Sequence, residues 1–218
     1  RGERYIKPSE LETMAKALKL SVDRIKQEDT KKQDSELQHL IDTKMMNGRA
    51  VELAQELVQT AIGYTEKFAI LNRLGAVYYY RKQYKKSRET WLEALSHAQR
   101  IAENYQEMEP LCKVTSNLIS AYNALKDYAG LARLLDQMEP ELYEFDPEYA
   151  GTLCLSFAIT AYNVGNLELV REKLGQSLSY YRKTESSVLI GKGIHNIAYH
   201  EYLIGNHFVA KEKCVSRA

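Results

Sequence analysis

The segment 71–94 predicts two antiparallel helices packed face to face. Leu71, Leu74 and Tyr78 recur at the spacing of one helical stripe, and Gly75 has no side chain where a second helix must come close. After a break at Lys82-Gln83, a second stripe begins that includes one small residue able to receive the bulk of the first helix. Its members are Tyr84, Ser87, Trp91 and Ala94. The segment therefore predicts a tight helical hairpin.

The turn of this hairpin recurs along the chain, which indicates an internal repeat. Its counterparts are Lys126-Asp127-Tyr128, Gly165-Asn166-Leu167 and Gly205-Asn206-His207, at successive spacings of 44, 39 and 40 residues from Lys82-Gln83-Tyr84. In the second copy, Leu118-Ile119 places a bulky residue at the small position and Leu131 replaces the small residue of the return helix. We expect those two helices to pack less closely. A degenerate first hairpin is expected from Ser35 to Thr60, with its break at Asn47-Gly48.

The order of residue types in these hairpins resembles the tetratricopeptide repeat (TPR). The family pattern has a large residue, Leu-Gly and Tyr on the first helix, then Tyr, a small residue, an aromatic and Ala on the second. Segment 71–94 fills each position, although Lys82 replaces the usual turn glycine. The resemblance covers residues 35–218 and implies an all-α fold, a right-handed solenoid of TPR-like helical hairpins. A period near 40 exceeds the usual value of about 34, so longer helices are expected.

The first 26 residues predict a smaller helical unit. Ser9 is expected to be the N-cap of a helix, with Glu12 as its capping-box partner, and Ser21 the cap of a last short helix. The run resembles the C-terminal half of a phage-repressor-type (XRE/Cro-like) helix-turn-helix domain. The matching residues, in order, are Gly2, Pro8, Leu11, Met14-Ala15, Leu18, Leu20-Ser21-Val22 and Ile25.

In that family the recognition helix precedes the glycine, so it would lie upstream of Arg1, and the chain begins without Met. We therefore expect the chain to start inside a DNA-binding domain. The resemblance implies that Arg1, Arg4 and Lys7 lie beside DNA phosphates, contacts that position a protein without specifying sequence. The alternative is that residues 9–26 are a helical hairpin docked on the solenoid.

Residues 27–34, with alternating charges and no large apolar side chain, are expected to link the two parts. The predicted organisation is thus a partial helix-turn-helix domain at 1–26, a linker at 27–34 and a TPR-like domain at 35–218, truncated at its C-terminal end. A short polar joint would let the head change its angle relative to the repeats.

Composition argues against several other classes of protein. The net charge of +1 gives no global attraction to nucleic acid or anionic lipid. The sequence lacks an apolar run of membrane-spanning length and a leader, and its three cysteines lack C-x-x-C spacing, so a cytoplasmic protein with buried thiols at Cys154 and Cys214 is expected. Motifs typical of enzymes are missing, and the spacing of the histidines near the C-terminal end does not suit a metal site. We expect neither catalysis, a metal nor a cofactor.

Stacked hairpins line an inner surface with their first helices. In the repeat family the inward side chains lie on the first helix, opposite its packing against the second. Carried over residue by residue, they are Asn72, Arg73, Tyr79, Tyr80, Ser116, Asn117, Ser120, Asn123, Ser156, Tyr162, Asn163, Lys192, His195, Asn196, Tyr199 and Tyr202. Amides can pair with the backbone of an extended peptide and tyrosines supply flat apolar contact. Asn117 and Asn196 stand where peptide-binding repeats often carry a backbone-clamping Asn. The alternative for each residue is that it is solvated or bonded to a neighbouring helix.

A repressor-type head followed by long TPR hairpins resembles the peptide-responsive quorum-sensing regulators of Gram-positive bacteria, the RRNPP group. The resemblance implies a transcriptional regulator whose TPR domain binds a short signalling peptide and thereby changes DNA affinity or oligomer state. It also implies a homodimer, because two heads bind a palindromic site. Two alternatives are a TPR scaffold with no role on DNA and a response-regulator-binding member of the same group. Residues upstream of Arg1 would distinguish them.

Overall fold

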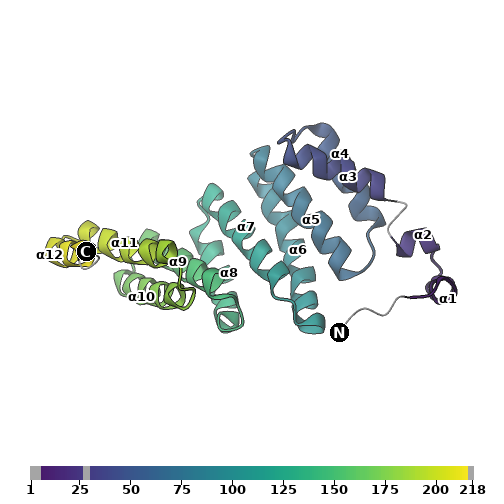
Figure 1. Cartoon of the computed structure of the whole chain (residues 1–218). Coiled ribbons are helices and arrows are strands. Elements are labelled where there is room, and N and C mark those ends of the chain that lie inside the picture. Colours follow the sequence, from purple (N-terminus) through teal and green to yellow (C-terminus); the bar gives the residue numbers. More distant parts are fainter. Residues whose placement is uncertain (1–5, 27–29, 216–218) are drawn as a thin grey trace. The chain divides into compact units, whose positions relative to one another are not determined.

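The computed structural model describes residues 6–26 and 30–215, and every regular element in this part of the chain is a helix. Figure 1 shows these helices following one another in pairs along the chain. Two compact units can be distinguished, Arg1–Thr90 and Trp91–Ala218, and each is described by itself. The boundary falls inside helix α6, Tyr84–Tyr105.

Within its described residues, the first unit contains five complete helices. They are α1 (Pro8–Leu18), α2 (Val22–Ile25), α3 (Lys31–Asp42), α4 (Gly48–Thr60) and α5 (Gly63–Tyr80). The pair α3 and α4 is the predicted degenerate first hairpin, with its break at residues 43–47. Its core joins α3, α4 and α5 through buried Leu37, Leu53, Leu57, Leu74 and Tyr78. The first hairpin is therefore confirmed, and it packs against the helix that the sequence pattern identified first.

Close approach at Gly75 is also confirmed. The buried hydroxyl of Ser87, on α6, donates a hydrogen bond to the carbonyl oxygen of Gly75, on α5, at 2.8 Å. The small residues of the two helices therefore meet as the sequence pattern predicted.

The second unit begins with the remainder of α6 and contains three helical pairs. Its elements are α7 (Glu109–Leu125), α8 (Tyr128–Met138), a 3-10 turn (Glu139–Glu141), α9 (Pro147–Asn163), α10 (Leu167–Lys183), α11 (Ser187–Leu203) and α12 (His207–Val215). The α7/α8 pair packs less extensively than α9/α10, as expected from the bulky residues of the second copy. Cys112 and Cys154 are buried, whereas the side chain of Cys214 lies outside the described part.

The turns within the pairs share one backbone conformation, and this confirms the predicted register of the repeats. A residue with positive φ stands in each of the four predicted turns, namely Lys82 (59°), Lys126 (54°), Gly165 (80°) and Gly205 (85°). The next amide donates to the carbonyl five residues earlier, for example Gln83 N to Tyr78 O at 2.9 Å, which is the Schellman bond that closes a helix. Two of the four residues are lysines, which is possible because the left-handed conformation favours glycine but does not require it.

Asparagine and aspartate then start the return helices. The side chain of Asp127 accepts from Gly130 N at 2.8 Å, and that of Asn166 accepts from Leu169 N at 3.1 Å. Asn47 does the same for α4. These are N-caps, so the turn sequences Lys-Asp and Gly-Asn end one helix and begin the next.

The start of α1 differs from the prediction. Ser9 is not the N-cap, because Pro8 already occupies the first helical position and Lys7 stands before it. The Lys7 amide donates to Glu10 Oε2 at 3.0 Å, so Glu10 rather than Glu12 closes this end. Ser21 does cap α2, accepting from the amide three residues on. Part of the predicted linker is also helical, since α3 begins at Lys31.

Tyr181 fills the seam of the second unit. Its side chain is fully buried on α10, beside Gly151 of α9 and Gly193 of α11. Its hydroxyl lies 3.2 Å from the hydroxyl of Thr152, and Ser177 donates to Gly151 O at 2.7 Å. The glycines leave the room that this ring needs, so α9, α10 and α11 pack as one layered group.

Candidate functional site

The predicted inner-face residues lie on the first helix of each pair. The first four, Asn72, Arg73, Tyr79 and Tyr80, are on α5 in the first unit. The other twelve are in the second unit: Ser116, Asn117, Ser120 and Asn123 on α7; Ser156, Tyr162 and Asn163 on α9; and Lys192, His195, Asn196, Tyr199 and Tyr202 on α11. Their joint role as a peptide surface stays a prediction, and each unit is considered separately.

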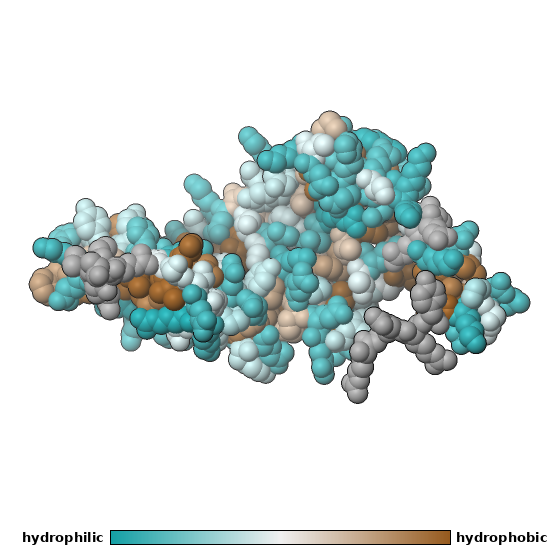
Figure 2. All heavy atoms as spheres, in the orientation of Figure 1, coloured by the Kyte–Doolittle hydropathy of each residue, from teal (hydrophilic) through white to brown (hydrophobic). Residues whose placement is uncertain are grey.

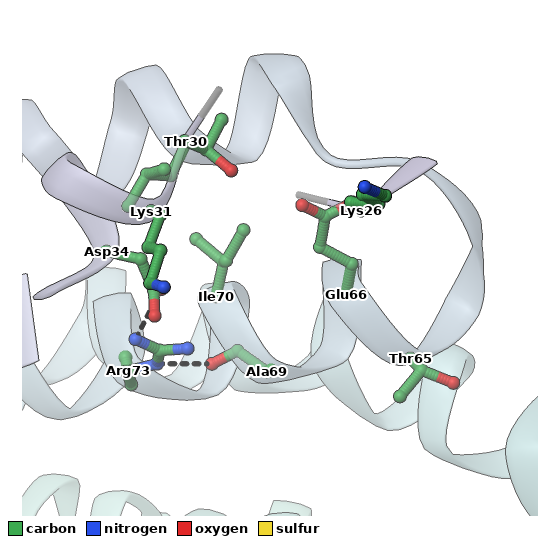
Figure 3. A pocket seen from close by; sticks show the side chains of 10 residues that line it. Lys26, Thr30, Lys31, Asp34, Thr65, Glu66, Ala69, Ile70 and Arg73 are labelled. Carbon is green, nitrogen blue, oxygen red and sulfur yellow. Dashed lines mark hydrogen bonds and ion pairs between the residues drawn. The ribbon is translucent and has the colours of Figure 1, made fainter. Parts of the chain in front are cut away.

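In the first unit, Arg73 is engaged by a neighbouring helix. Its guanidinium donates to Asp34, on α3, at 2.6 Å and to the carbonyl oxygen of Ala69 at 3.3 Å (Figure 3). Tyr79 packs near Tyr80 and Tyr84, with ring centroids 6.2 and 5.2 Å away. Arg73 therefore acts first as a link between α3 and α5.

Arg73 also lines a cavity of about 390 Å³ between the first helices of this unit (Figure 3). Lys26, Lys31 and Glu66 lie around the same space. Glu66 is paired with Arg24 of α2, and both side chains are nearly buried. Both carboxylates of the lining, Asp34 and Glu66, already have cationic partners. These ion pairs join α3 and α2 to α5.

Several predicted residues in the second unit bond to their own helix. Ser120 donates to Ser116 O at 3.2 Å, Ser156 to Thr152 O at 3.0 Å, and Asn163 to Ile159 O at 2.8 Å. Hydroxyls and amides in these positions commonly satisfy the local backbone. These three hydrogen bonds therefore favour a structural role over a ligand contact for these side chains.

Four predicted residues do come together, around an open cavity of about 450 Å³ between α9, α10 and α11. They are Tyr162, Lys192, Asn196 and Tyr199. The rest of the lining is mainly apolar and comprises Leu155, Ala158, Ile159, Val170, Leu174, His200 and Leu203. Figure 2 shows apolar side chains reaching the surface over this group of helices. We refer to this space as the α9–α11 cavity.

Two polar atoms of this lining are buried without a partner. Asn196 Nδ2 and His200 Nε2 have no hydrogen-bond partner within residues 6–26 and 30–215. The two residues are four apart on α11, so they share one face. A buried polar group left unpaired costs about 1–3 kcal/mol, and native structures contain few of them. Both residues line the α9–α11 cavity, so these two atoms are candidates for hydrogen bonds to a ligand group.

The electrostatics keep His200 neutral. Burial is the largest cause of its lowered pKa, the Arg171 guanidinium acts in the same direction, and the Glu201 carboxylate opposes them. A neutral imidazole has one nitrogen that accepts a hydrogen bond and one that donates. His200 can therefore offer an uncharged hydrogen-bonding group to a ligand at pH 7.

Glu201, the next residue on α11, is held ionised. The hydrogen bond from Asn206 at 2.6 Å is the largest cause of its lowered pKa; Arg171, which donates at 3.1 Å, lowers it further, and burial works against both. These bonds join α11 to α10 and to the turn before α12. They fix the helix that carries Asn196 and His200.

Two tyrosines, Tyr162 and Tyr199, line the cavity. Tyr162 meets His200 edge to face, with centroids 6.3 Å apart. Tyr199, about half exposed, lies parallel to His195 at 6.2 Å, and Lys192 has its ammonium 5.8 Å from the ring of Tyr181. Exposed tyrosines give a bound chain rigid, partly apolar contact area.

Sequence reasoning missed His200 and the floor of the cavity. His200 is not among the predicted site residues, although its spacing of four from Asn196 places both on one face. Val170 and Leu174 lie in the core of this unit and also close the cavity. The spacing of four between Asn196 and His200 could therefore have identified His200 from the sequence. The apolar floor of the cavity could not have been found in this way, because it depends on how three helices pack.

Lys7 is exposed before α1, and Arg1 and Arg4 lie outside the described residues. Within the described part, no cluster of His, Cys, Asp or Glu has the arrangement of a metal site. None of the helices in that part is both long and apolar enough to cross a membrane.

Comparison with known proteins defines the class of fold. The apo form of RapI matches with a TM-score of 0.71 at 15% identity, over 85% of this chain and 67% of that one. TPR-like repeats of a protein described as a kinesin light chain, from Podosopora anserina, match with a TM-score of 0.65 at 17% identity, covering 84% and 90%. PlcR of Bacillus thuringiensis, solved with the peptide PapR7 and DNA, matches with a TM-score of 0.55 at 12% identity, covering 96% and 79%.

The chain thus has a TPR-like helical-repeat fold, as the sequence pattern predicted. No protein-family model matches the sequence, and no curated protein matches it.

Proposed function

We propose that this chain is the peptide-sensing part of a transcriptional regulator. Its repeat domain binds a short signalling peptide on the faces of α7, α9 and α11, and binding changes the DNA affinity or oligomer state of the full-length protein. The observation that carries this proposal is the α9–α11 cavity, where unpaired Asn196 and His200 atoms lie beside apolar and tyrosine side chains. An apolar lining with a few polar groups is the usual composition of a ligand site.

Two fold neighbours support the regulatory interpretation. PlcR has the same class of fold and was solved with a peptide and DNA, and RapI is the match with the higher TM-score. A shared fold hosts many functions, so the proposal depends on the cavity and on the repressor-like sequence of residues 1–26. In that reading, Lys7 and the preceding arginines contact DNA phosphates.

The DNA part is tested with the full-length protein. It should shift a fragment of its own promoter in a way that weakens steeply with salt, because phosphate contacts release counterions. The chain beginning at Arg1 should not shift that fragment if the recognition helix lies upstream. Two heads on a palindromic site require a dimer, which light scattering of the full-length protein measures. A monomer with no DNA binding would remove the transcriptional reading.

A second candidate is a scaffold that binds a protein partner. The kinesin-light-chain repeats match this chain over most of both lengths, so the fold alone fits either use. The cavity separates the two, because a scaffold that recognises a folded partner has no need of a small apolar cavity with unpaired polar atoms. Titration with the short peptides secreted by the source organism tests this directly: binding supports the sensor, and its absence favours the scaffold or a response-regulator partner.

A further inference from the structure

The α9–α11 cavity has the dimensions and lining of a side-chain pocket. Its volume of about 450 Å³ falls in the range of small-ligand sites, roughly 300–1,000 Å³. Ala158, Val170 and Leu174 are buried in its wall, and Ile159 and Leu203 extend toward solvent. A carboxylate or ammonium placed there would lose its hydration against hydrocarbon. Lys192, the charged residue of the lining, is itself exposed, with its ammonium near the ring of Tyr181, so the apolar wall of the cavity selects an uncharged, apolar group.

The two unpaired atoms add a second requirement. Asn196 Nδ2 is a donor and needs a carbonyl oxygen, and neutral His200 can use Nε2 to accept from an N–H group. Residues four apart on a helix have Cβ atoms about 5–6 Å from each other. One amino-acid residue carries a carbonyl on one flank and an N–H on the other at a comparable separation. An aliphatic or lipid ligand would leave His200 Nε2 unpaired.

We infer that the α9–α11 cavity anchors one large apolar residue of the ligand peptide, with the flanking carbonyl bonded to Asn196 and the flanking N–H bonded to His200. This inference rests on the proposed peptide-binding function and specifies which residue class the peptide must contain. Tyr162 and Tyr199 cover the anchored residue at the mouth.

The test uses the whole chain and four small probes, observed by NMR at the Asn196 side-chain amide and the His200 ring nitrogens. N-acetyl-leucine methylamide has the side chain and both flanking groups. The glycine analogue lacks the side chain, the methyl ester lacks the flanking N–H, and the aspartate analogue replaces the apolar group by a charge. We expect saturable shifts at both residues with leucine methylamide, and about 10-fold or greater weakening with glycine or aspartate.

The ester and the variants test the hydrogen bonds. The ester should bind roughly 3- to 10-fold more weakly than the methylamide, and His200→Phe should abolish that difference. Asn196→Ala should weaken the methylamide by a similar factor. Asn104→Ala is the matched control, since Asn104 is exposed on α6, away from the cavity lining, and should leave the affinity unchanged. The inference is overturned if leucine methylamide causes no shift at either residue, or if the glycine analogue binds equally well.

These results separate the inference from the function on which it rests. If secreted peptides bind the chain but leucine methylamide does not reach the cavity, the anchor assignment is wrong and the sensing function stands. If leucine methylamide binds as described and no secreted peptide binds, the anchor chemistry is correct and the proposed function is wrong.

Discussion

Gly151→Ala is a direct test of the packing that holds the candidate site together. A Cβ at position 151 would lie 2.6 Å from both the Cδ1 and Cε1 atoms of the Tyr181 ring and 3.3 Å from Ser177 O. The ring cannot retreat freely, because its other edge faces Gly193, where an added Cβ would already lie 3.3 Å away. The substitution therefore forces α9 away from α10 or turns a fully buried ring out of place.

Two opposing effects set the magnitude. Replacing a mid-helix glycine by alanine gains about 1 kcal/mol of helix propensity. Overpacking a tight core costs about 1–3 kcal/mol, and the upper end applies here since the ring is held at both edges. The net result is a destabilisation of about 2 kcal/mol. Gly175→Ala, on α10, is the matched control: nothing lies within 4 Å of an added Cβ, so it should stabilise by about 1 kcal/mol.

Urea unfolding followed by far-ultraviolet circular dichroism measures both variants. With a slope of about 1–3 kcal/mol per molar urea, Gly151→Ala should lower the midpoint by about 1 M and Gly175→Ala should raise it. In a Tyr181→Leu background the cost of Gly151→Ala should largely disappear, because the two residues are coupled through direct contact. The packing account is refuted if Gly151→Ala stabilises the chain as much as Gly175→Ala does.

Four further predictions concern charge and backbone. The ionised Glu201 stabilises the fold above the ordinary carboxyl pKa of about 4.3, and this contribution should fade as pH falls through its lowered pKa; urea midpoints of Glu201→Gln should depend less on pH in that window. His200 resists protonation when folded, so stability should fall as pH drops below about 6.5, and His200→Phe should flatten that slope in the same assay. Lys82→Gly should raise the free energy of unfolding measured in urea by about 0.5–1 kcal/mol, since φ is 59° there; an unchanged free energy would show that the turn is unstrained. Glu66→Ala strands the nearly buried Arg24, so hydrogen exchange in α2 should accelerate, and unaltered exchange would deny that this ion pair holds α2.

The repeat register could be predicted because its signals are local. A residue able to take positive φ followed by Asn or Asp stops one helix and starts the next, so Lys126-Asp127 and Gly165-Asn166 mark turns without reference to the rest of the chain. The close contact at Gly75 was predictable for the same reason. At α1 the predicted N-cap was wrong, because Pro8 occupies the first helical position and so places Ser9 inside the helix.

The candidate site could be predicted only in part. The resemblance to the repeat family placed Tyr162, Asn196 and Tyr199 on the inner face, and the structure gathers them around one cavity. The cavity depends on the spacing of α9, α10 and α11, and Tyr181 packs between Gly151 of α9 and Gly193 of α11. Because this packing involves three helices, it cannot be predicted from the sequence of any one of them.

The central claim is that the inner faces of α9 and α11, with α7, bind a short peptide. Calorimetric titration of the chain with the short peptides secreted by its source organism measures this, beside an Asn117→Ala, Asn196→Ala double variant. We predict one peptide that saturates the wild-type chain, contains a large apolar residue and binds the variant at least about 10-fold more weakly, as expected for the loss of two polar contacts. Equal affinity for both proteins, or no binding by any such peptide, would contradict the account.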